Sequence, residues 1–398
     1  MDIIKKDDTD ISLSKANKFL KTTNKILSKF NSTSMVDASW VNNFYKWADE
    51  NNISETIIPR DRNELLNMDT LNLSNLKLKM IPKEIGYLEN LKGLYIGRND
   101  LVFLPKEIGN LKSLKGLYVG HNKLEIIPKE IGNLKNLVAL FLGHNYISKL
   151  PKEIGYLENL ESLNVARNEL FEIPESIGNL KNLAGLHLGR NHLKKLPQSI
   201  GNLINLQALY LGENRLEEFI NIEYLEELEE LYLNSNKLET IPKEIGKLQY
   251  LHKLSLGDNN IKIIPKEIGK LVYLEELYLF SNQIEELPKE IGDLKYLVEL
   301  FLGSNKLKKL PKEIGKLNHL EELYLFANQI EELPEEICKL ENLRKIDIYS
   351  NKLTKLPDCI RKLVNIKKFD LKENNLELTI HQQKFLDELK NKGALIKC

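Results

Sequence analysis

The chain has few cysteines, no net charge and no long apolar run, and each absence excludes a class of protein. Three cysteines in 398 residues are too few for a disulfide framework and favour a reducing compartment. Lys and Arg together number 57, as do Asp and Glu, so no overall charge attracts the chain to nucleic acid or to an anionic membrane. No run of about 18 apolar residues occurs, so we expect no transmembrane helix.

The amino terminus also lacks the pattern of a secretion signal. In the opening string MDIIKKDDTDIS, acidic residues directly follow the lysines, and no apolar stretch of the required length is present. We therefore expect a cytoplasmic protein. Export by a route that needs no such signal stays open as the alternative.

Sequence motifs for catalysis are missing as well. No phosphate-binding loop, dinucleotide fingerprint, zinc-protease string or nucleophile elbow occurs. The cysteines Cys338 and Cys359, and the neighbouring histidines His121 and His144, are too few to hold zinc. We expect no enzyme activity, no cofactor and no metal, and the alternative is an enzyme whose site is assembled from distant residues.

What the chain does have is one repeated string. A residue that opens the pattern L-x-L-x-x-N-x-L recurs every 23 residues, apart from one interval of 22. The fourteen opening residues are Leu71, Leu94, Leu117, Leu140, Leu163, Leu186, Leu209, Leu231, Leu254, Leu277, Leu300, Leu323, Ile346 and Phe369. The alternation predicts a short strand with one buried face. Because one strand cannot bury its leucines alone, the copies must stack into a parallel sheet over a continuous core.

The remaining positions of each repeat predict how the chain turns. An asparagine follows the opening residue by five positions in every copy except the first, which has Leu76. Its amide can donate and accept, so we predict that it satisfies backbone groups where the chain leaves the strand. The second half reads P-x-x-I-G-x-L. Proline starts a turn or short helix and glycine permits a bend, which predicts a convex face of helical or 3-10 turns.

This pattern resembles the leucine-rich-repeat family, in its 23-residue class with the L-P-x-x-I-G-x-L signature. Bacterial repeat proteins and the plant Ras-group-related repeat proteins are similar. The resemblance covers residues 66 to about 380. It implies an α/β fold, a right-handed horseshoe solenoid with a parallel sheet on its concave face and helical caps. It implies little about function, because the family serves many partners.

Helices are predicted at both ends, where an open solenoid would expose leucines and strand edges. Residues 36–51 place Trp40, Phe44 and Trp47 on one helical face, and residues 379–392 form a second helix that ends at Gly393. The predicted division is an N-terminal helical region and cap (1–65), a repeat solenoid (66–378) and a C-terminal cap (379–398). Residues 11–30 predict a further amphipathic helix, either another cap or a contact for a membrane or partner.

One repeat is irregular, and it lies between Leu209 and Leu231. Its convex half reads LEEFINIEYLEEL from Leu216, with Ile220 in the usual proline position, so one residue has been lost between Phe219 and Ile222. We predict a tighter turn there, while the flanking strands still pair. The deletion is either neutral drift or a local change in curvature that weakens the coupling between the two sides.

The exposed position between the two strand leucines is aromatic in eight of the fourteen repeats. These residues are Tyr95, Tyr118, Phe141, Tyr210, Tyr232, Tyr278, Phe301 and Tyr324. Two positions further along the strand, Phe280, Phe326 and Tyr349 add more rings. Two interpretations stay open: a rigid protein-binding surface, or rings that only stack on one another and favour the strands.

Charge on the predicted concave face changes along the chain. Early repeats carry basic residues, repeats eight to twelve carry acidic ones, and the last two are basic again. The residues in question are Lys92, Lys115, Arg98, Arg167 and Arg190, then Glu229, Glu230, Glu275, Glu276, Glu299, Glu321 and Glu322, then Arg344, Lys345, Lys367 and Lys368. Such zones can orient a partner, or they can be copies of a duplicated module without function.

We therefore predict a monomeric, non-catalytic scaffold that binds a protein partner on its concave face. The predicted site consists of the eight aromatic residues together with Arg98, Arg167, Arg190, Glu275, Glu276, Glu321 and Glu322. A role in signalling is implied by the plant resemblance alone. The alternative is a bacterial host-interaction or effector-type repeat protein, and nucleic acid is disfavoured as a partner.

Overall fold

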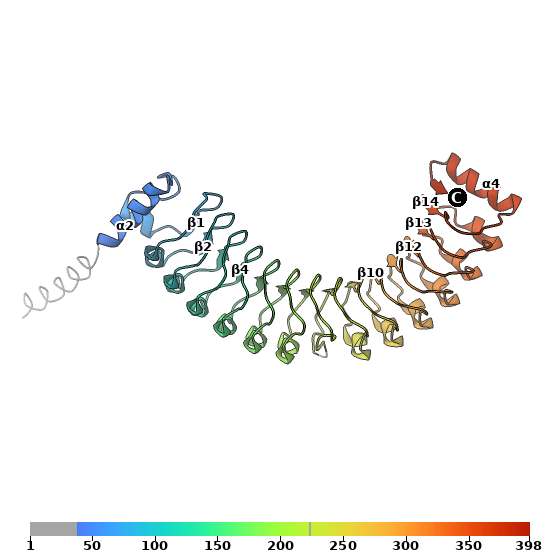
Figure 1. Ribbon diagram of the computed structural model, residues 1–398, viewed down its shortest axis with the longest axis horizontal. Helices are drawn as coiled ribbons and strands as arrows, with labels where there is room; N and C mark the ends of the chain where they lie inside the picture. The colour runs from blue at the N-terminus through green and yellow to red at the C-terminus, as the bar shows by residue number, and fades with distance from the viewer. Residues whose placement is uncertain (1–37, 223) are drawn as a thin grey trace, which may run out of the picture.

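The computed structural model describes residues 38–222 and 224–398, which form an open arc of stacked repeats (Figure 1). Each repeat places a three-residue strand on the inner side of the arc. Within the described residues the strands form a single 15-stranded parallel sheet in chain order. The strands are β1 (Thr70–Asn72), β2 (Gly93–Tyr95), β3 (Gly116–Tyr118), β4 (Ala139–Phe141), β5 (Ser162–Asn164), β6 (Gly185–His187), β7 (Ala208–Tyr210), β8 (Glu230–Tyr232), β9 (Lys253–Ser255), β10 (Glu276–Tyr278), β11 (Glu299–Phe301), β12 (Glu322–Tyr324), β13 (Lys345–Asp347), β14 (Lys368–Asp370) and β15 (Leu395–Lys397). The predicted horseshoe fold is confirmed.

The strand register follows the repeat length. The opening leucine is the central residue of its strand, so Leu277 lies opposite Leu254 on one side and Leu300 on the other. All three are fully buried. A constant 23-residue spacing therefore stacks leucine on leucine and keeps the alternate residues on the exposed concave face.

The outer side of the arc consists of 3-10 helices, each preceded by the repeat's proline. Those of the described residues are η1 (Lys83–Tyr87), η2 (Lys106–Asn110), η3 (Lys129–Asn133), η4 (Lys152–Tyr156), η5 (Glu175–Asn179), η6 (Gln198–Asn202), η7 (Lys243–Lys247), η8 (Lys266–Lys270), η9 (Lys289–Asp293), η10 (Lys312–Lys316), η11 (Glu335–Lys339) and η12 (Asp358–Lys362). They match the predicted convex turns.

The glycine of these turns has a different role from the one predicted. None of them has a positive φ; among the described glycines only Gly393 does. A Cβ on Gly292 would instead lie 2.3 Å from the backbone oxygen of Glu313 in the next repeat. The glycine is therefore required because neighbouring 3-10 helices approach closely, and the prediction that it permits a bend was wrong.

The asparagine column joins consecutive repeats, as predicted. The Asn282 side chain is buried, and its Oδ1 accepts a hydrogen bond from Ile261 N at 2.9 Å. Its Nδ2 donates to the backbone oxygens of Leu256 at 2.9 Å and Leu279 at 3.1 Å. One side chain thus satisfies backbone groups of its own repeat and of the preceding one, which a buried turn requires.

Helices close both ends of the arc. Helix α2 (Ala38–Glu50) buries Trp40, Phe44 and Trp47, and Trp40 stacks on Tyr87 of η1 with ring centroids 4.7 Å apart. The short helix α3 (Arg62–Leu66) leads into β1 and was not predicted. The helix expected at residues 11–30 lies outside the described residues.

At the C-terminus, α4 (Ile380–Asn391) begins with a capping box between Thr379 and Gln382. Gly393, with a φ of 90°, follows the helix and terminates it. The last residues then add β15 to the sheet beside β14, which the sequence did not predict. The end of the solenoid is thus closed by a strand as well as by a helix.

The irregular repeat keeps its strands and loses its 3-10 helix. Strands β7 and β8 pair with Leu209 opposite Leu231, as predicted. Between them, the described residues contain no 3-10 helix. Ile220 and Ile222 are both buried, so the shortened segment still fills the core. The row of convex 3-10 helices is therefore interrupted between η6 and η7.

Two of the three cysteines form a disulfide bond between η11 and η12, Cys338 with Cys359. Cys338 stands in the glycine position of its repeat, and Cys359 in the glutamate position of the next. These positions face each other at short range: a Cβ on Gly315 would lie 2.7 Å from the Cβ of Glu336. The paired substitution turns this close approach into a covalent link. This bond between adjacent repeats was not predicted from the sequence.

Candidate protein-binding surface

The aromatic residues between the strand leucines point to the concave face, and their rings stack across neighbouring repeats. They form three runs of three rings. The first run contains Tyr95, Tyr118 and Phe141, with centroid distances of 4.5 and 5.1 Å. The second contains His187, Tyr210 and Tyr232, at 4.1 and 4.8 Å. The third contains Tyr278, Phe301 and Tyr324, at 4.7 and 4.2 Å.

Polar residues interrupt the column between these runs, at Asn164 and Ser255. The structure therefore divides the eight predicted aromatic residues into three separate groups. His187 completes the second group and was not proposed as a site residue. Its place in the same repeat position was the signal that could have identified it.

Tyrosine hydroxyl groups of the column form hydrogen bonds with glutamates of the acidic repeats. Tyr278 Oη donates to Glu276 at 2.7 Å and to Glu299 at 2.9 Å. Burial raises the pKa of Tyr278, and the bonds to these two carboxylates raise it further. The hydroxyl therefore stays protonated and acts as a donor. These contacts link Tyr278 to its own strand and to the next one, and the Tyr278 side chain remains partly exposed on the concave face.

Additional rings widen the third run. Phe280 lies over Gly257 of the preceding repeat, where a Cβ would come within 2.5 Å of the ring. Phe326 covers Gly303 in the same way, at 2.4 Å. Both phenylalanines are only partly buried. Phe280 and Phe326, in the residues that follow β10 and β12, thus add two partly exposed rings to the same repeats as the third run.

The predicted acidic residues are largely paired with neighbouring repeats. Glu276 contacts Lys253 at 2.6 Å and Glu275 contacts His252 at 3.5 Å. At the other end of the zone, Glu322 contacts Lys345 at 2.5 Å and Glu321 contacts Arg344 at 3.2 Å. These inter-repeat pairs reduce the negative charge that the acidic zone can present to a partner.

The predicted arginines lie just beyond the strands, in the turn position before the conserved asparagine. Arg98, Arg167 and Arg190 are exposed and have left-handed backbone conformations, with φ between 55° and 57°. Arg190 contacts Glu213 at 2.6 Å. No ion pair of Arg98 or Arg167 occurs within the described part of the chain. The arginines thus flank the aromatic column without belonging to it.

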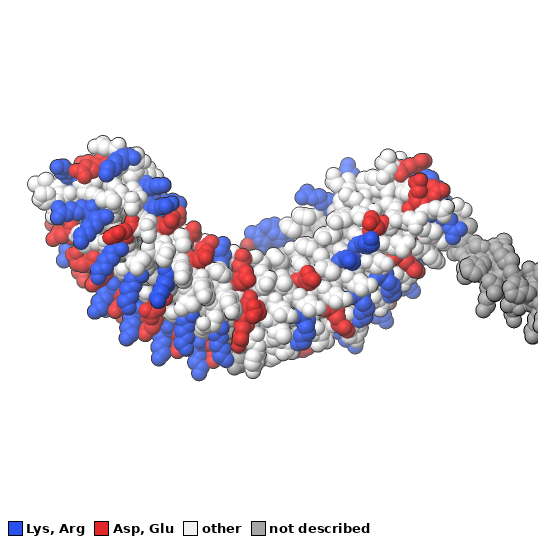
Figure 2. All heavy atoms as spheres, turned by 180° about the vertical axis from the view of Figure 1, so that it is seen from behind, with Lys and Arg blue, Asp and Glu red and all other residues white. Residues whose placement is uncertain are grey.

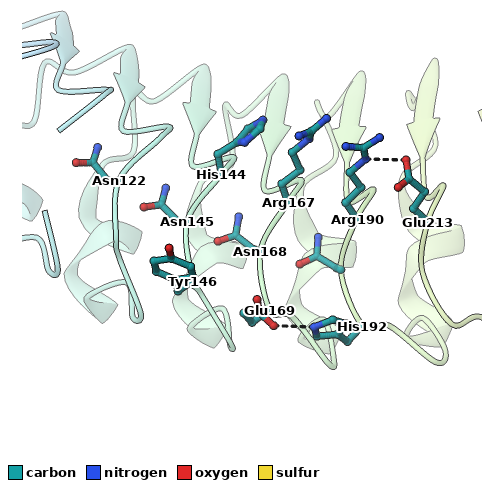
Figure 3. A pocket seen from close by; sticks show the side chains of 11 residues that line it. Asn122, His144, Asn145, Tyr146, Arg167, Asn168, Glu169, Arg190, His192 and Glu213 are labelled. Atoms are coloured by element: carbon teal, nitrogen blue, oxygen red, sulfur yellow. Dashed lines mark hydrogen bonds and ion pairs between the residues drawn. The ribbon is translucent and has the colours of Figure 1, made fainter. Parts of the chain in front are cut away.

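A shallow depression of about 560 Å³ lies below Arg167 and Arg190 (Figure 3). His144, Arg167 and Arg190 form its upper row, and His192 and Glu169 pair at 2.6 Å on its lower side. The sequence did not predict this depression, because its walls combine the repeated asparagines with residues from variable positions of several repeats. Its polar walls could bind an anionic or hydrogen-bonding group.

Charged side chains are unevenly distributed over the surface. On the side drawn in Figure 2, they gather in rows along the lower edge of the C-terminal half, while much of the N-terminal half is uncharged. Within the described residues, one group could in principle ligate a metal, Glu335 with Cys338 and Cys359. Since both cysteines are in the disulfide, they offer no thiolate ligand.

The chain matches two protein families. The family described as a leucine-rich repeat region matches residues 140–236, 163–258, 242–323 and 300–395. A second, described as leucine rich repeat, matches residues 67–124. No curated protein matches the sequence. In the described part of the chain, no helix has the length and apolar character needed to span a bilayer.

Solved structures with the same fold come from bacteria and plants. A leucine-rich-repeat protein of Leptospira interrogans is 39% identical, with 84% of this chain and 85% of that chain covered and a TM-score of 0.79. An internalin of Listeria monocytogenes is 23% identical over 90% of this chain and 96% of its own, with a TM-score of 0.69, and shows the fold alone. The Arabidopsis receptor kinase HAESA, solved in complex with a peptide hormone and a co-receptor, is 29% identical. The match covers 79% of this chain and 58% of that chain, with a TM-score of 0.62.

Proposed function

This chain belongs to the leucine-rich-repeat family, and from that premise we propose that it is a non-catalytic scaffold that holds a protein partner against its concave face. The observation that carries the proposal is the third aromatic run. Tyr278, Phe301 and Tyr324, widened by Phe280 and Phe326, form a rigid aromatic surface. Clustered aromatic side chains of limited flexibility are typical of the energetic centres of protein interfaces.

Stacking alone does not account for the two phenylalanines. Phe280 and Phe326 are not part of the stacked column and cover glycines of the preceding repeats. The same position is glycine in several early repeats, as at Gly97 and Gly120, so the fold does not require a ring there. Apolar rings that the sheet does not need and that remain partly exposed favour a binding role.

The location and oligomeric state are part of the same proposal. We propose a monomeric protein in the cytoplasm, and the Cys338–Cys359 bond, which is more typical of an oxidising environment, is the observation that speaks against this location. Cell fractionation with thiol labelling tests the location, and size-exclusion chromatography with light scattering tests the oligomeric state. A cytoplasmic protein with free Cys338 and Cys359 thiols would agree with this location, and a disulfide-bonded protein outside the cytoplasm would contradict it.

The proposed surface can be tested with two triple variants of matched chemistry. The test variant changes Tyr278, Phe301 and Tyr324 to Ala. The control changes Tyr250, Tyr273 and Tyr296 to Ala, three tyrosines that lie outside the concave column in adjacent repeats and are 51%, 46% and 49% exposed. Both sets remove three rings, so the general effect of aromatic loss is the same.

The measurement compares the proteins retained by each immobilised full-length variant, followed by affinity measurement with the purified partner. We expect partners bound by the wild type and by the control to be lost from the test variant, with unchanged far-UV circular dichroism. Each of two or more lost hot-spot rings contributes roughly 2 kcal/mol, so affinity should fall at least about a thousandfold. Equal retention by all three proteins would rule out this surface.

A further inference from the structure

Five neighbouring repeats carry a cationic side chain or a histidine in the turn position before the conserved asparagine. This set is called the cationic ladder and consists of Arg98, His121, His144, Arg167 and Arg190. All five are exposed and have φ between 55° and 58°. The rings of His121 and His144 stack at a centroid distance of 4.0 Å. The ladder therefore runs continuously along the rim of the concave face.

The fold does not require positive charge in this position. From the seventh repeat onward, the same turn is occupied by Ser, Ala, Asp or Glu, with similar φ values: Glu213, Ser235, Asp258, Ser281, Ser304, Ala327, Ser350 and Glu373. Burial, together with the neighbouring His121, Arg167 and Arg190, lowers the pKa of His144, so the arginines carry most of the positive charge of the ladder. Arg190 has Glu213, but Arg98 and Arg167 make no ion pair with the described residues.

The surroundings of the ladder leave room for an extended chain. Gly97 and Gly120 lie between the ladder and the first aromatic run, and only backbone atoms approach them, whereas the Asn164 side chain approaches Gly143. A separate depression of about 560 Å³ is lined by His144, Arg167 and Arg190 and by residues that follow the turn, Tyr146, Glu169 and His192 (Figure 3). A strand-like ligand along the ladder would have cations on one side and the rings of Tyr95 and Tyr118 on the other.

The length of the cationic ladder limits which class of anionic ligand can bind along it. Four intervals of about 4.8 Å, the spacing of neighbouring strands, give a span of about 19 Å, which is about six residues of extended peptide. Beyond Arg190, the concave side presents Glu213, Glu230 and Asp258. A uniformly charged polymer such as a nucleic acid would meet these acids, whereas a peptide can confine its acidic residues to the ladder.

We propose that the cationic ladder binds an extended acidic peptide segment of the partner protein. This inference rests on the proposed scaffold function and adds the chemistry of the bound segment. Alternating acidic and aromatic residues suit the site best, because alternate side chains of a strand point in opposite directions. The acidic side chains would contact the arginines, and the aromatic ones would reach the first ring run.

The test uses a fluorescein-labelled peptide of about seven residues that alternates Glu and Tyr, with fluorescence anisotropy at low salt. The ladder variant is R98E/R167E in the full-length protein. Glu213 and Glu373 already occupy the same turn position, so the variant should fold. The control is R62E/R361E, which reverses two exposed arginines outside the ladder and changes the net charge equally. R98Q/R167Q provides a neutral version if reversal disturbs folding.

We expect the ladder variant to bind the peptide at least about tenfold more weakly and the control to bind within about twofold of the wild type. Wild-type binding should also weaken between about 50 and 200 mM NaCl. Equal binding by the ladder variant would overturn the inference. Tighter binding of an oligothymidylate or a heparin fragment than of the peptide would overturn the choice of a peptide ligand.

The two proposals fail separately. If the peptide does not bind, but loss of Tyr278, Phe301 and Tyr324 still abolishes partner capture, the ladder inference is wrong and the scaffold surface stands. If the peptide binds through the ladder, but those three rings have no effect on capture, the ladder inference is supported and the third aromatic run is not the partner surface.

Discussion

Among individual residues, the asparagine that recurs in every repeat after the first links each repeat to the preceding one. Asn282 accepts a hydrogen bond from one repeat and donates to carbonyl oxygens of two. An amide is the only common side chain of this size that can do both at a buried position. This explains why leucines vary to Ile346 and Phe369 at the opening position, while the asparagine is retained in every repeat after the first.

Asn282→Asp should therefore be strongly destabilising. The carboxylate keeps the acceptor but cannot donate, so the carbonyl groups of Leu256 and Leu279 lose a buried partner. We expect a loss of about 2 kcal/mol or more from the free energy of unfolding, measured by urea denaturation. Asn318→Asp, at an exposed position in a nearby repeat, is the matched control and should change stability by less than about 0.5 kcal/mol. Similar losses in both variants would contradict this role of the buried amide.

His187 makes the second aromatic run sensitive to pH. Burial against Tyr210 lowers the pKa of His187, and the nearby Glu230 carboxylate opposes this shift only in part. The unfolded chain then takes up the proton first, near pH 6.5. The contribution of His187 to stability is therefore complete above about pH 6.5 and decreases as the pH falls below that value.

An NMR titration of the His187 ring should give a midpoint below about 6.5 in the folded protein. His187→Gln should remove the corresponding part of the acid sensitivity, seen as a smaller loss of stability between about pH 6.5 and pH 5. A midpoint for His187 at or above about 6.5 would show that burial does not control its titration.

At the scale of elements, the repeat between β7 and β8 is the weakest link. Its strands pair normally, yet the 3-10 helix of the other repeats is absent from its described residues. Helix η6 therefore has no 3-10 partner on its C-terminal side. Since each repeat of a solenoid is stabilised by its neighbours, a weaker interface uncouples the two halves.

Inserting a Glu between Asn221 and Ile222 restores the 23-residue length and should stabilise this interface. In the wild type, we expect hydrogen exchange to be fastest around residues 216–231 and unfolding to begin there, with two steps in the transition. The insertion should raise protection in this segment and merge the steps, with a gain of about 1 kcal/mol. Wild-type protection equal to that of the flanking repeats would leave no basis for a hinge.

A structural feature could be predicted from the sequence when it recurs in each repeat. Strands, asparagine bonds and convex turns follow from spacing, and they were predicted. The reason for Gly292 was missed because it depends on the distance between adjacent 3-10 helices, which periodicity does not give. The Cys338–Cys359 bond was missed because it joins different positions of adjacent repeats. The contact of Glu276 with Lys253 was missed although the two residues occupy the same repeat position and lie opposite each other in the sheet.

At the scale of the whole molecule, the arc is closed at its N-terminal end by α2 and the segment that follows it. Trp40, Phe44 and Trp47 of α2 are buried, and so are Ile58 and Leu65 before the first strand. Removing them would expose the leucines of the first repeat and the free edge of β1. Such apolar surfaces and open strand edges promote association.

A chain lacking residues 1–65 should therefore aggregate or form oligomers, as measured by size-exclusion chromatography with light scattering. A chain lacking residues 1–37 keeps the tryptophans of α2 and is the control, for which we expect a monomer with unchanged melting. If the longer deletion also remained monomeric and melted at the same temperature, α2 would not be acting as a cap.

The bond between Cys338 and Cys359 also has a mechanical consequence. Pulled from its two ends between optical traps, the chain should peel repeat by repeat, and each 23-residue unit should release up to about 8 nm of contour length. The bond spans 21 residues, so under oxidising conditions it withholds about 7 nm from the fully extended chain. Adding a reductant under load should release that length in one final step. The contour length of the extended chain therefore reports whether the Cys338–Cys359 bond is formed.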